Sequence, residues 1–181
     1  AGFAYLPLEV LSPVLREIIN LRPVLGLRSP VHTVSRLLNP FSATHVLQGI
    51  FHRGFQDTHQ VAAQILGYSE VAVFRGEGGE IERRPNKPAE VFTLSGGALG
   101  EENWPTLIDD PVQPEDADMD ISRLARIWRG EEDDEYGAAA VAGTLAIALK
   151  LLGRAGSIDQ ADSDARAMWQ GRDRTKMGLA A

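Results

Sequence analysis

The sequence predicts an α/β fold: a mostly parallel sheet flanked by helices and followed by an all-helical C-terminal third. Three patterns predict it. Residues 44–74 read as a strand, a helix and a second strand with short joints, which is a βαβ unit. Residues 70–74 are almost continuously apolar, as in a strand that a parallel sheet buries on both faces. From residue 120 onward, apolar residues recur at the spacing of an amphipathic helix.

The first elements are expected in the order strand, helix, strand. Residues 2–7 read as a short strand bounded by glycine and proline. Ser12 followed by Pro13 predicts a helix start, because a hydroxyl caps free N–H groups and proline suits the first helical position. A second strand is expected over residues 44–51.

A helix over residues 57–66 should connect that strand to the buried strand at 70–74. We expect its inward face to carry Val61, Ala62, Ile65 and Leu66, and Gly67 to end it in a left-handed turn. A further strand is expected over residues 89–94.

The remainder should begin with a connection and continue as helices. Residues 101–120 carry eight acidic residues, three prolines and no base, which indicates a solvated connection. Helices are expected from residue 120, over residues 136–152, and from a Ser157 cap to about residue 171. The last helix should turn Ala161, Ala165, Met168 and Trp169 inward. We divide the chain into an α/β part, residues 1–119, and a helical part of the same domain, residues 120–181.

Composition bounds the class of protein. The 181 residues suffice for one domain, and 44% hydrophobic with 24% charged residues is typical of a globular protein. The absence of cysteine excludes disulfides, thiol catalysis and thiolate metal sites, and we expect a cytoplasmic protein. The longest apolar run, residues 138–149, is shorter than the ~20 residues that span a bilayer, so no membrane partner is expected.

The four histidines lack the i, i+4 spacing of a helical metal site. No G-x-S-x-G elbow supports a Ser-His-Asp triad, but sequence spacing alone leaves such a triad open.

Charge is distributed unevenly along the chain. The net charge is −7, which argues against general attraction to nucleic acid or an anionic membrane. Residues 1–60 carry five arginines and three acidic residues, whereas residues 101–181 carry nine basic and seventeen acidic residues. Any polyanion should therefore approach the N-terminal third.

The segment over residues 21–41, here called the connector, concentrates cationic side chains. It contains Arg22, Arg28, His32 and Arg36, and its Pro23 and Pro30 prevent one continuous helix. Guanidinium groups on a stiffened, irregular segment favour an anion-binding role. A helix–loop connection with ordinary surface arginines explains the same residues.

The connector and its surroundings resemble the anthranilate phosphoribosyltransferase family (glycosyltransferase family 3). Residues 21–40 follow the pattern L-R-x-x-L-G-L-R-S-x-x-H-x-x-x-x-L-L-N-P. Ser12-Pro13 with Arg16 upstream, then G-I-F-H at 49–52 and V-A-V-F-R-G-E-G-G at 71–79, fall in the family's order. The resemblance covers most of residues 1–100 and, more weakly, the helical remainder. It implies the C-terminal part of a divergent member and part of a larger phosphoribosyltransferase-like domain.

What the resemblance implies about function is specific. It implies phosphoribosyl transfer from phosphoribosyl diphosphate to a small aromatic or amine acceptor, with Arg22 contacting the acceptor carboxylate and His32 and Arg36 lining the same substrate site. His32 stands where an Asn is usual, and Ser35-Arg36 stand where a Gly-Pro makes room for substrate, so an altered acceptor or reduced activity is expected. It also implies magnesium held by an Asp-Glu pair, which here is Ile81 and Glu82. Glu82 is therefore the one expected metal ligand, because an alkyl group cannot ligate a hard cation.

Other readings stay open at this point. The family's glycine-rich diphosphate loop and Lys-His-Gly-Asn segment are not found in these residues, so the chain alone should not perform the transfer. The resemblance also implies a homodimer formed through an N-terminal helical part that these residues lack. A divergent branch of the family is associated with nucleic acid, so a non-catalytic protein binding single-stranded nucleic acid through Arg22, Arg28, Arg36 and Arg53 is the alternative. A structural domain without a ligand is a third reading.

Overall fold

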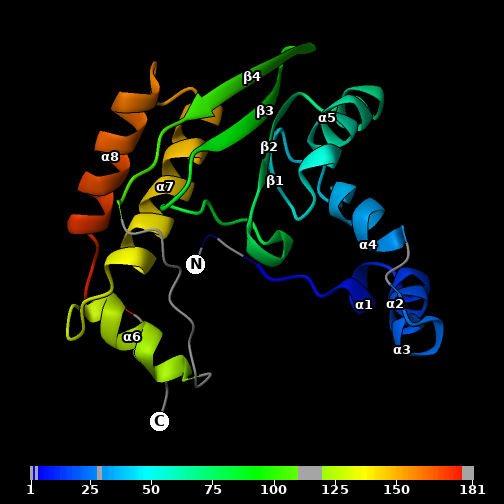
Figure 1. The fold of residues 1–181 in the computed structure, drawn as a ribbon, viewed down its shortest axis with the longest axis horizontal. Coiled ribbons are helices and arrows are strands. Elements are labelled where there is room, and N and C mark those ends of the chain that lie inside the picture. The colour runs from blue at the N-terminus through cyan, green and yellow to red at the C-terminus, as the bar shows by residue number, and fades with distance from the viewer. Residues whose placement is uncertain (1, 3, 28–29, 110–119, 177–181) are drawn as a thin grey trace.

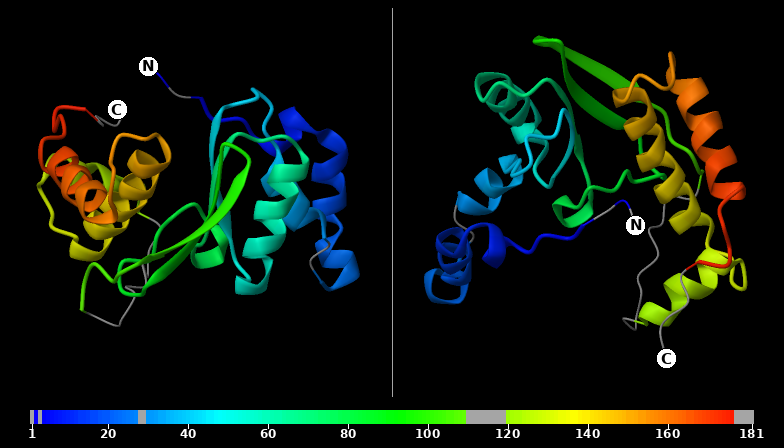
Figure 2. Two further views of the ribbon diagram at one scale, coloured as in Figure 1. Left: turned by 90° about the horizontal axis from the view of Figure 1, so that it is seen from above. Right: turned by 180° about the vertical axis from the view of Figure 1, so that it is seen from behind.

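A computed structural model describes residues 2, 4–27, 30–109 and 120–176, and shows one sheet between two helical layers (Figure 1). Helices α7 (Glu135–Leu151) and α8 (Ile158–Gln170) lie on one side of the sheet. Helix α5 (Gln56–Ile65) and the N-terminal helices lie on the other side, as the view from above also shows (Figure 2). The predicted α/β class and the helical C-terminal part are confirmed.

The sheet has the strand order β1 (His45–Ile50), β2 (Glu70–Arg75), β3 (Ala89–Ser95) and β4 (Ala98–Trp104). Strands β1 and β2 pair in parallel through the predicted βαβ unit, whereas β2–β3 and β3–β4 pair antiparallel. The sheet is therefore mixed, not mostly parallel. Residues 76–88 contain no crossover helix, and Gly96 and Gly97, both at positive φ, reverse the chain tightly between β3 and β4.

Strand β4 lies where the sequence predicted the start of a solvated connection. Five of its seven residues are exposed and one is half-buried, so the strand has no apolar run to reveal it. Only Trp104 at its end is buried. The second half of the predicted connection, residues 110–119, lies outside the described residues.

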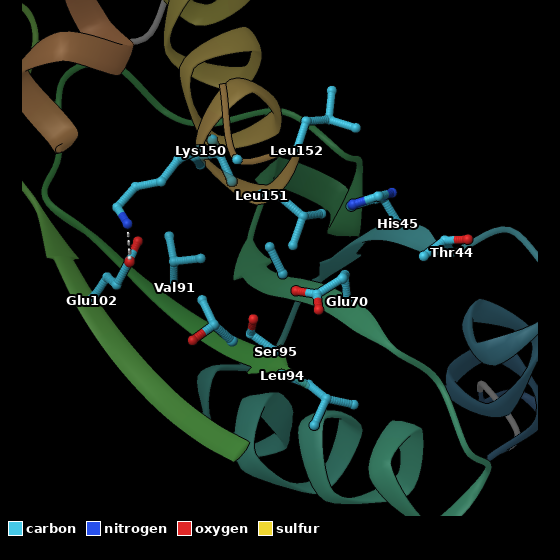
Figure 3. Close-up of a pocket in the computed structure, with 14 residues that line it drawn as sticks. Thr44, His45, Glu70, Val91, Leu94, Ser95, Glu102, Lys150, Leu151 and Leu152 are labelled. Carbon is cyan, nitrogen blue, oxygen red and sulfur yellow. Dashed lines mark ion pairs between the residues drawn. The ribbon is translucent and has the colours of Figure 1, made fainter. Parts of the chain in front are cut away.

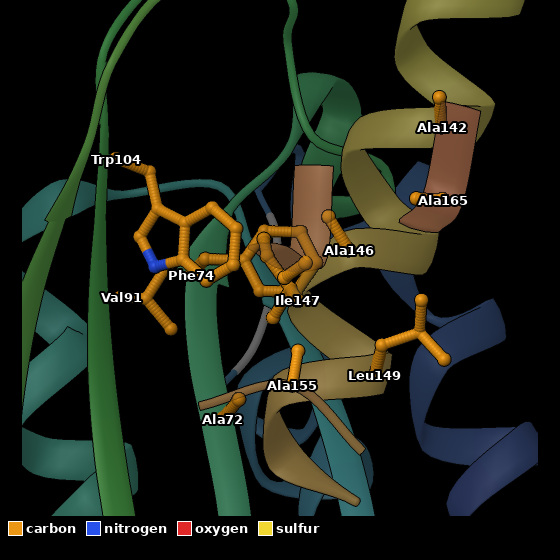
Figure 4. Packing of buried hydrophobic residues seen from close by; sticks show 11 residues of the cluster. Ala72, Phe74, Val91, Trp104, Ala142, Ala146, Ile147, Leu149, Ala155 and Ala165 are labelled. Atoms are coloured by element: carbon orange, nitrogen blue, oxygen red, sulfur yellow. The ribbon is translucent and has the colours of Figure 1, made fainter. Parts of the chain in front are cut away.

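Two cores form because successive residues of a strand face opposite sides of the sheet. Ala72 and Phe74 face α7, where they pack with Val91, Trp104 and Ile147 (Figure 4). Val71 and Val73 face α5 and pack with Ile50, Ala63 and Leu94. The small residues Ala161 and Ala165 of α8 are fully buried, as predicted, whereas Met168 is exposed.

The predicted inward face of α5 is wrong. Its buried residues are Gln56, His59, Gln60 and Ala63, while Val61, Ile65 and Leu66 are exposed. The glutamine amides explain this rotation: Gln56 Nε2 donates to Glu90 O at 2.8 Å, and Gln60 Nε2 donates to Thr93 O at 2.6 Å and Gly100 O at 2.7 Å. The helix is thus fixed to β3 and β4 by buried hydrogen bonds, which a purely apolar pattern cannot anticipate.

The N-terminal segment is helical but shallowly packed. It comprises α1 (Leu8–Leu11), α2 (Pro13–Asn20), α3 (Arg22–Leu25), α4 (Val31–Val34) and the 3-10 turn η1 (Ser35–Leu37), none with a fully buried residue. Ser12 caps α2 as predicted, its hydroxyl accepting from Leu15 N at 3.4 Å. The strand predicted over residues 2–7 is absent from the described residues there, which pair with no strand of the sheet.

The C-terminal helices are each capped by an oxygen-bearing side chain. Asp120 caps α6 (Ile121–Arg129), Asp134 caps α7, and Ser157 caps α8 as predicted. After α8, the Arg172 guanidinium lies over the Trp169 ring at 3.9 Å and donates to Trp128 O at 2.8 Å, which holds the end of the chain against α6. In the part of the chain that the structure describes, no helix combines the length and apolar character needed to cross a membrane.

Candidate functional site

The connector reaches the carboxyl edge of the parallel strand pair. Arg36 Nη1 donates to Gly49 O in β1 at 2.9 Å and also to Gly79 O in the turn η3 (Glu77–Gly79) that follows β2. This one guanidinium therefore joins the connector to the ends of both parallel strands. In open α/β sheets, ligands bind outside the carboxyl ends of the strands, which makes this edge the first place to look for a site.

A cavity of about 430 Å³ opens there between the connector and α5. It is lined by His32 and Arg36 from the connector and by Ile50, Phe51, His52, Phe55, Thr58 and His59 from β1 and the segment that follows it. The His52 ring makes edge-to-face contacts with Phe51 and Phe55, with ring centroids 4.8 and 6.1 Å apart. The structure thus brings together two of the three predicted substrate-binding residues, in a wall that suits a flat aromatic ligand.

His59 is the buried titratable group of this cavity. It is 1% exposed, and its Nδ1 lies 3.1 Å from Gln48 Oε1. Burial lowers the pKa of the imidazole, and the neighbouring Arg36 charge lowers that pKa further. With a neutral ring, Nδ1–H donates to Gln48 and Nε2 is left as an acceptor without a partner among the described residues. Sequence reasoning missed His59 because it stands on a helix face that was expected to be outward.

The other predicted connector residues are placed differently. Arg22 begins α3, is exposed, and does not line the cavity that holds His32 and Arg36. Arg28 lies outside the described residues.

Glu82, the predicted metal ligand, follows η3 at the same edge. Loss of water around the Glu82 carboxyl raises its pKa, and the nearby Glu80 carboxylate raises that pKa further. Ile81 between them is half-exposed and offers no ligand atom. No group of three or more histidine, aspartate or glutamate side chains within the described ranges is arranged to hold a metal ion. Glu80 and Glu82 are the two carboxylates on either side of Ile81. Mg²⁺ commonly binds one or two protein carboxylates when substrate phosphates supply further oxygens.

Arg53 lies in the turn η2 (Arg53–Phe55) and has a carboxylate partner. Its Nε donates to Glu90 Oε2 at 2.9 Å, and its Nη2 contacts Glu90 Oε1. It lines a smaller cavity together with Arg75 and Arg84, two residues that the sequence did not single out as site residues. Arg36 and Arg53 therefore line different cavities, and Arg22 lines neither of them.

A further cavity of about 480 Å³ lies at the opposite edge, between the sheet and the end of α7 (Figure 3). His45 and Glu70 begin the two parallel strands there, and Lys150 Nζ lies 2.8 Å from Glu102 Oε1. None of the predicted site residues lines it.

Comparison with known proteins finds relatives that are similar to part of this chain. No protein-family model matches the chain. An anthranilate phosphoribosyltransferase from Sulfolobus acidocaldarius is 28% identical over 98 residues, which is 54% of this chain and 29% of that protein. One from Nitratidesulfovibrio vulgaris is 30% identical over 111 residues, 61% of this chain and 33% of that protein. An uncharacterized protein from Aquifex aeolicus is 34% identical over 80 residues, 44% of this chain and 26% of that protein.

The fold is shared with a solved structure. The crystal structure of anthranilate phosphoribosyltransferase (TrpD) from Thermus thermophilus superposes with a TM-score of 0.71 and 23% sequence identity. It covers 93% of this chain, which in turn covers 51% of that chain. The chain therefore matches a third or less of these curated relatives and about half of the solved structure.

Proposed function

Because this chain is a divergent and partial relative of the anthranilate phosphoribosyltransferases, we propose that it is the C-terminal portion of a phosphoribosyltransferase-like protein. The whole protein would transfer a phosphoribosyl group from phosphoribosyl diphosphate to an amine acceptor, with an altered acceptor or reduced activity. Domain boundaries at 119/120, a homodimer and a cytoplasmic location stay predictions.

The observation that carries the proposal is the shared cavity of His32 and Arg36 at the carboxyl edge of the parallel strands. The Phe51, His52 and Phe55 rings would bind the acceptor ring, with the buried His59 behind them. Arg36 already donates to two backbone carbonyls, so it would shape the cavity more than bind a carboxylate. Arg22 does not line this cavity but is exposed on α3, and by resemblance it would contact the carboxylate of an acidic acceptor.

Magnesium would be held by Glu82, with Glu80 the nearest second carboxylate. The ion would neutralise the diphosphate of the donor when bound. Burial and then the Glu80 charge raise the pKa of Glu82, and a bound cation would offset both effects by favouring the ionised carboxylate.

Isothermal titration of the intact protein with phosphoribosyl diphosphate, in magnesium and in EDTA, tests the donor. We expect heat of binding only with magnesium, and weaker binding in Glu82→Gln. Anthranilate, added next, tests the acceptor: Arg22→Gln should weaken its binding at least ten-fold, since a hydrogen bond to a charged group contributes about 1.5–3 kcal/mol. Absence of donor binding in a folded intact protein would reject the transferase proposal.

The nucleic-acid alternative has a different signature. The Arg53 side chain is 69% exposed and Arg22 is exposed, so both could reach phosphates, although Glu90 neutralises much of the Arg53 charge. Retention of a single-stranded oligonucleotide that weakens steeply with salt, and that Arg28→Glu with Arg36→Glu abolishes, would favour it. Retention that is absent or independent of salt would reject it.

A further inference from the structure

The smaller cavity at the carboxyl edge is lined by three arginines that come from separate parts of the chain. It measures about 230 Å³, and Arg53 follows β1, Arg75 ends β2, and Arg84 lies in the segment before β3. Glu90 is the only carboxylate in its lining, so three guanidinium groups face one negative charge.

Arg75 is held in place through one nitrogen and leaves the others available. Its Nε donates to Phe51 O at 3.0 Å, which fixes the plane of the guanidinium against the end of β1. Among the residues that the structure describes, no carboxylate pairs with Arg75. Arg75 is half-buried, so its two Nη groups keep hydrogen-bonding capacity at the edge of the cavity.

Arg84 is also half-buried and only loosely paired. Its side chain is 13% exposed, and among the described residues it pairs with Glu77 Oε2 at 3.4 Å, a carboxylate that is itself half-exposed. Arg53 is paired with Glu90, which is the single carboxylate of the lining. Arg75 and Arg84 are therefore the two guanidinium groups with hydrogen-bonding capacity left for a guest.

We propose that this cavity binds a phosphoryl group, with Arg75 and Arg84 as its principal ligands. Planar guanidinium groups match the oxygens of phosphate bidentately, which a single lysine would not. The volume is below the range of about 300–1,000 Å³ typical of pockets for a whole small molecule, so it suits one group of a larger ligand. The Gln56 and Asn103 side chains in the lining surround it with polar atoms.

This site goes beyond the proposed function. None of the three arginines lies in the connector or in the cavity of His32, and neither acceptor binding nor transfer is needed for a phosphoryl group to bind here. The phosphoryl group could belong to a free diphosphate or phosphate ester, or to the backbone of a single-stranded nucleic acid.

Titration of the intact protein with inorganic diphosphate, and separately with a single-stranded oligonucleotide, tests the site. We expect at least one of these probes to bind, and Arg75→Gln with Arg84→Gln to weaken that binding more than ten-fold. Arg154→Gln, an exposed arginine after α7 at the opposite edge, is the matched control and should change it less than two-fold. Oligonucleotide binding that the double variant loses assigns the phosphoryl group to nucleic acid, and diphosphate binding that it loses, with no oligonucleotide binding, assigns it to a small molecule.

Two results would overturn the proposal: neither probe binds the folded protein, or the double variant binds as tightly as the unaltered protein. If the double variant fails to fold, Arg75→Lys and Arg84→Lys decide instead. Each keeps the charge but loses the bidentate fit, so each should weaken binding several-fold while the melting temperature is kept. Loss of anthranilate or phosphoribosyl diphosphate binding in Arg22→Gln or Glu82→Gln bears on the proposed transferase alone.

Discussion

Arg83 is fully buried, and its positive charge is balanced from several directions. Nη1 lies 3.0 Å from Asp162 Oδ1, Nη2 donates to Pro105 O at 2.5 Å, and the guanidinium carbon lies 4.9 Å from the Trp104 ring centre. Burial lowers the pKa of Arg83, while the Asp162 charge opposes that change. Since Arg83 directly follows Glu82, this network also fixes the backbone of the candidate metal ligand against α7 and α8.

Removing the counter-charge should be costly, because Arg83 cannot escape to water or lose its proton. We expect Asp162→Asn to lower the free energy of unfolding by about 3–5 kcal/mol, the usual cost of breaking a buried ion pair. Urea unfolding followed by circular dichroism measures it. Asp164→Asn, on the exposed face of the same helix, should change stability by less than about 0.5 kcal/mol. Equal effects of both substitutions would contradict the assigned role of the pair.

His59 should make stability depend on pH in the mildly acidic range. Its pKa in the folded chain is lowered from 6.5, so below pH 6.5 the unfolded chain takes up a proton that the folded chain does not. Stability therefore falls as pH falls from 6.5 towards the lowered pKa, by at most about 1.4 kcal/mol per pH unit. Denaturation midpoints at pH 7.5 and pH 5.5 should differ less in His59→Gln than in the unaltered protein. His45→Gln, an exposed histidine, should leave the difference unchanged.

At the scale of elements, the ends of the parallel strands are shaped by the absence of side chains. A Cβ on Gly49 in β1 would overlap the Glu80 backbone carbonyl, and so would one on Gly76 after β2. These glycines let the segment after η3 lie directly against the strand ends, where Arg36 then binds it. Close backbone approach is a recognised reason for glycine in a strand.

Gly49→Ala should therefore separate the turn from the sheet. We expect a loss of about 1–3 kcal/mol, as for other overpacked sites, together with weaker binding of any ligand in the His32 cavity. Gly54→Ala is the matched control, because nothing lies within 4 Å of a Cβ there and its φ is not positive. Thermal unfolding of the two variants side by side measures the contrast, and a stable Gly49→Ala protein would show that the segment can shift without cost.

The elements predictable from sequence were those whose local pattern agreed with their packing. The buried run of β2 and the Ser12, Gly67 and Ser157 signals carry their own physical cause in neighbouring residues. Strand β4 and the inward face of α5 were not predictable from local sequence, because tertiary contacts determine their positions. The exposed edge strand is positioned by pairing with β3, and the helix by glutamine hydrogen bonds to backbone carbonyls.

The site was predictable to the extent that the connector marks it. His32 and Arg36 line one cavity, but only the coordinates show that the Arg36 charge is occupied by Gly49 and Gly79 carbonyls. Arg75 and Arg84 could not be grouped with Arg53 from sequence, because sheet topology alone brings residues 53, 75 and 84 to one cavity. Counting charges along the sequence cannot reveal this spatial grouping of the three arginines.

At the scale of the whole molecule, the N-terminal third exposes many large apolar side chains, which a monomeric globular protein normally exposes only singly. Large apolar side chains stand out there and on neighbouring α5: Tyr5, Val10, Val14, Val24, Leu25, Leu27, Phe41, Ile65 and Leu66. Strand β1, at the end of the sheet, also has no second neighbour in the described chain. Exposed apolar patches and unpaired strand edges are typical of protein contact surfaces, so we expect further protein to pack here.

Hydrogen exchange of the 181-residue chain can measure how much less stably the N-terminal helices are packed than the sheet. Amides of α2, which has no buried residue, should exchange through local opening, much faster than amides of β2, whose Val71–Phe74 stretch is completely buried. Packing of further protein against the apolar residues, whether the rest of a longer polypeptide or a second copy, should slow exchange in α2 selectively and leave α7 unchanged. Protection of α2 equal to that of β2 in the monomeric 181-residue chain would mean that the N-terminal helices are stable without any such partner.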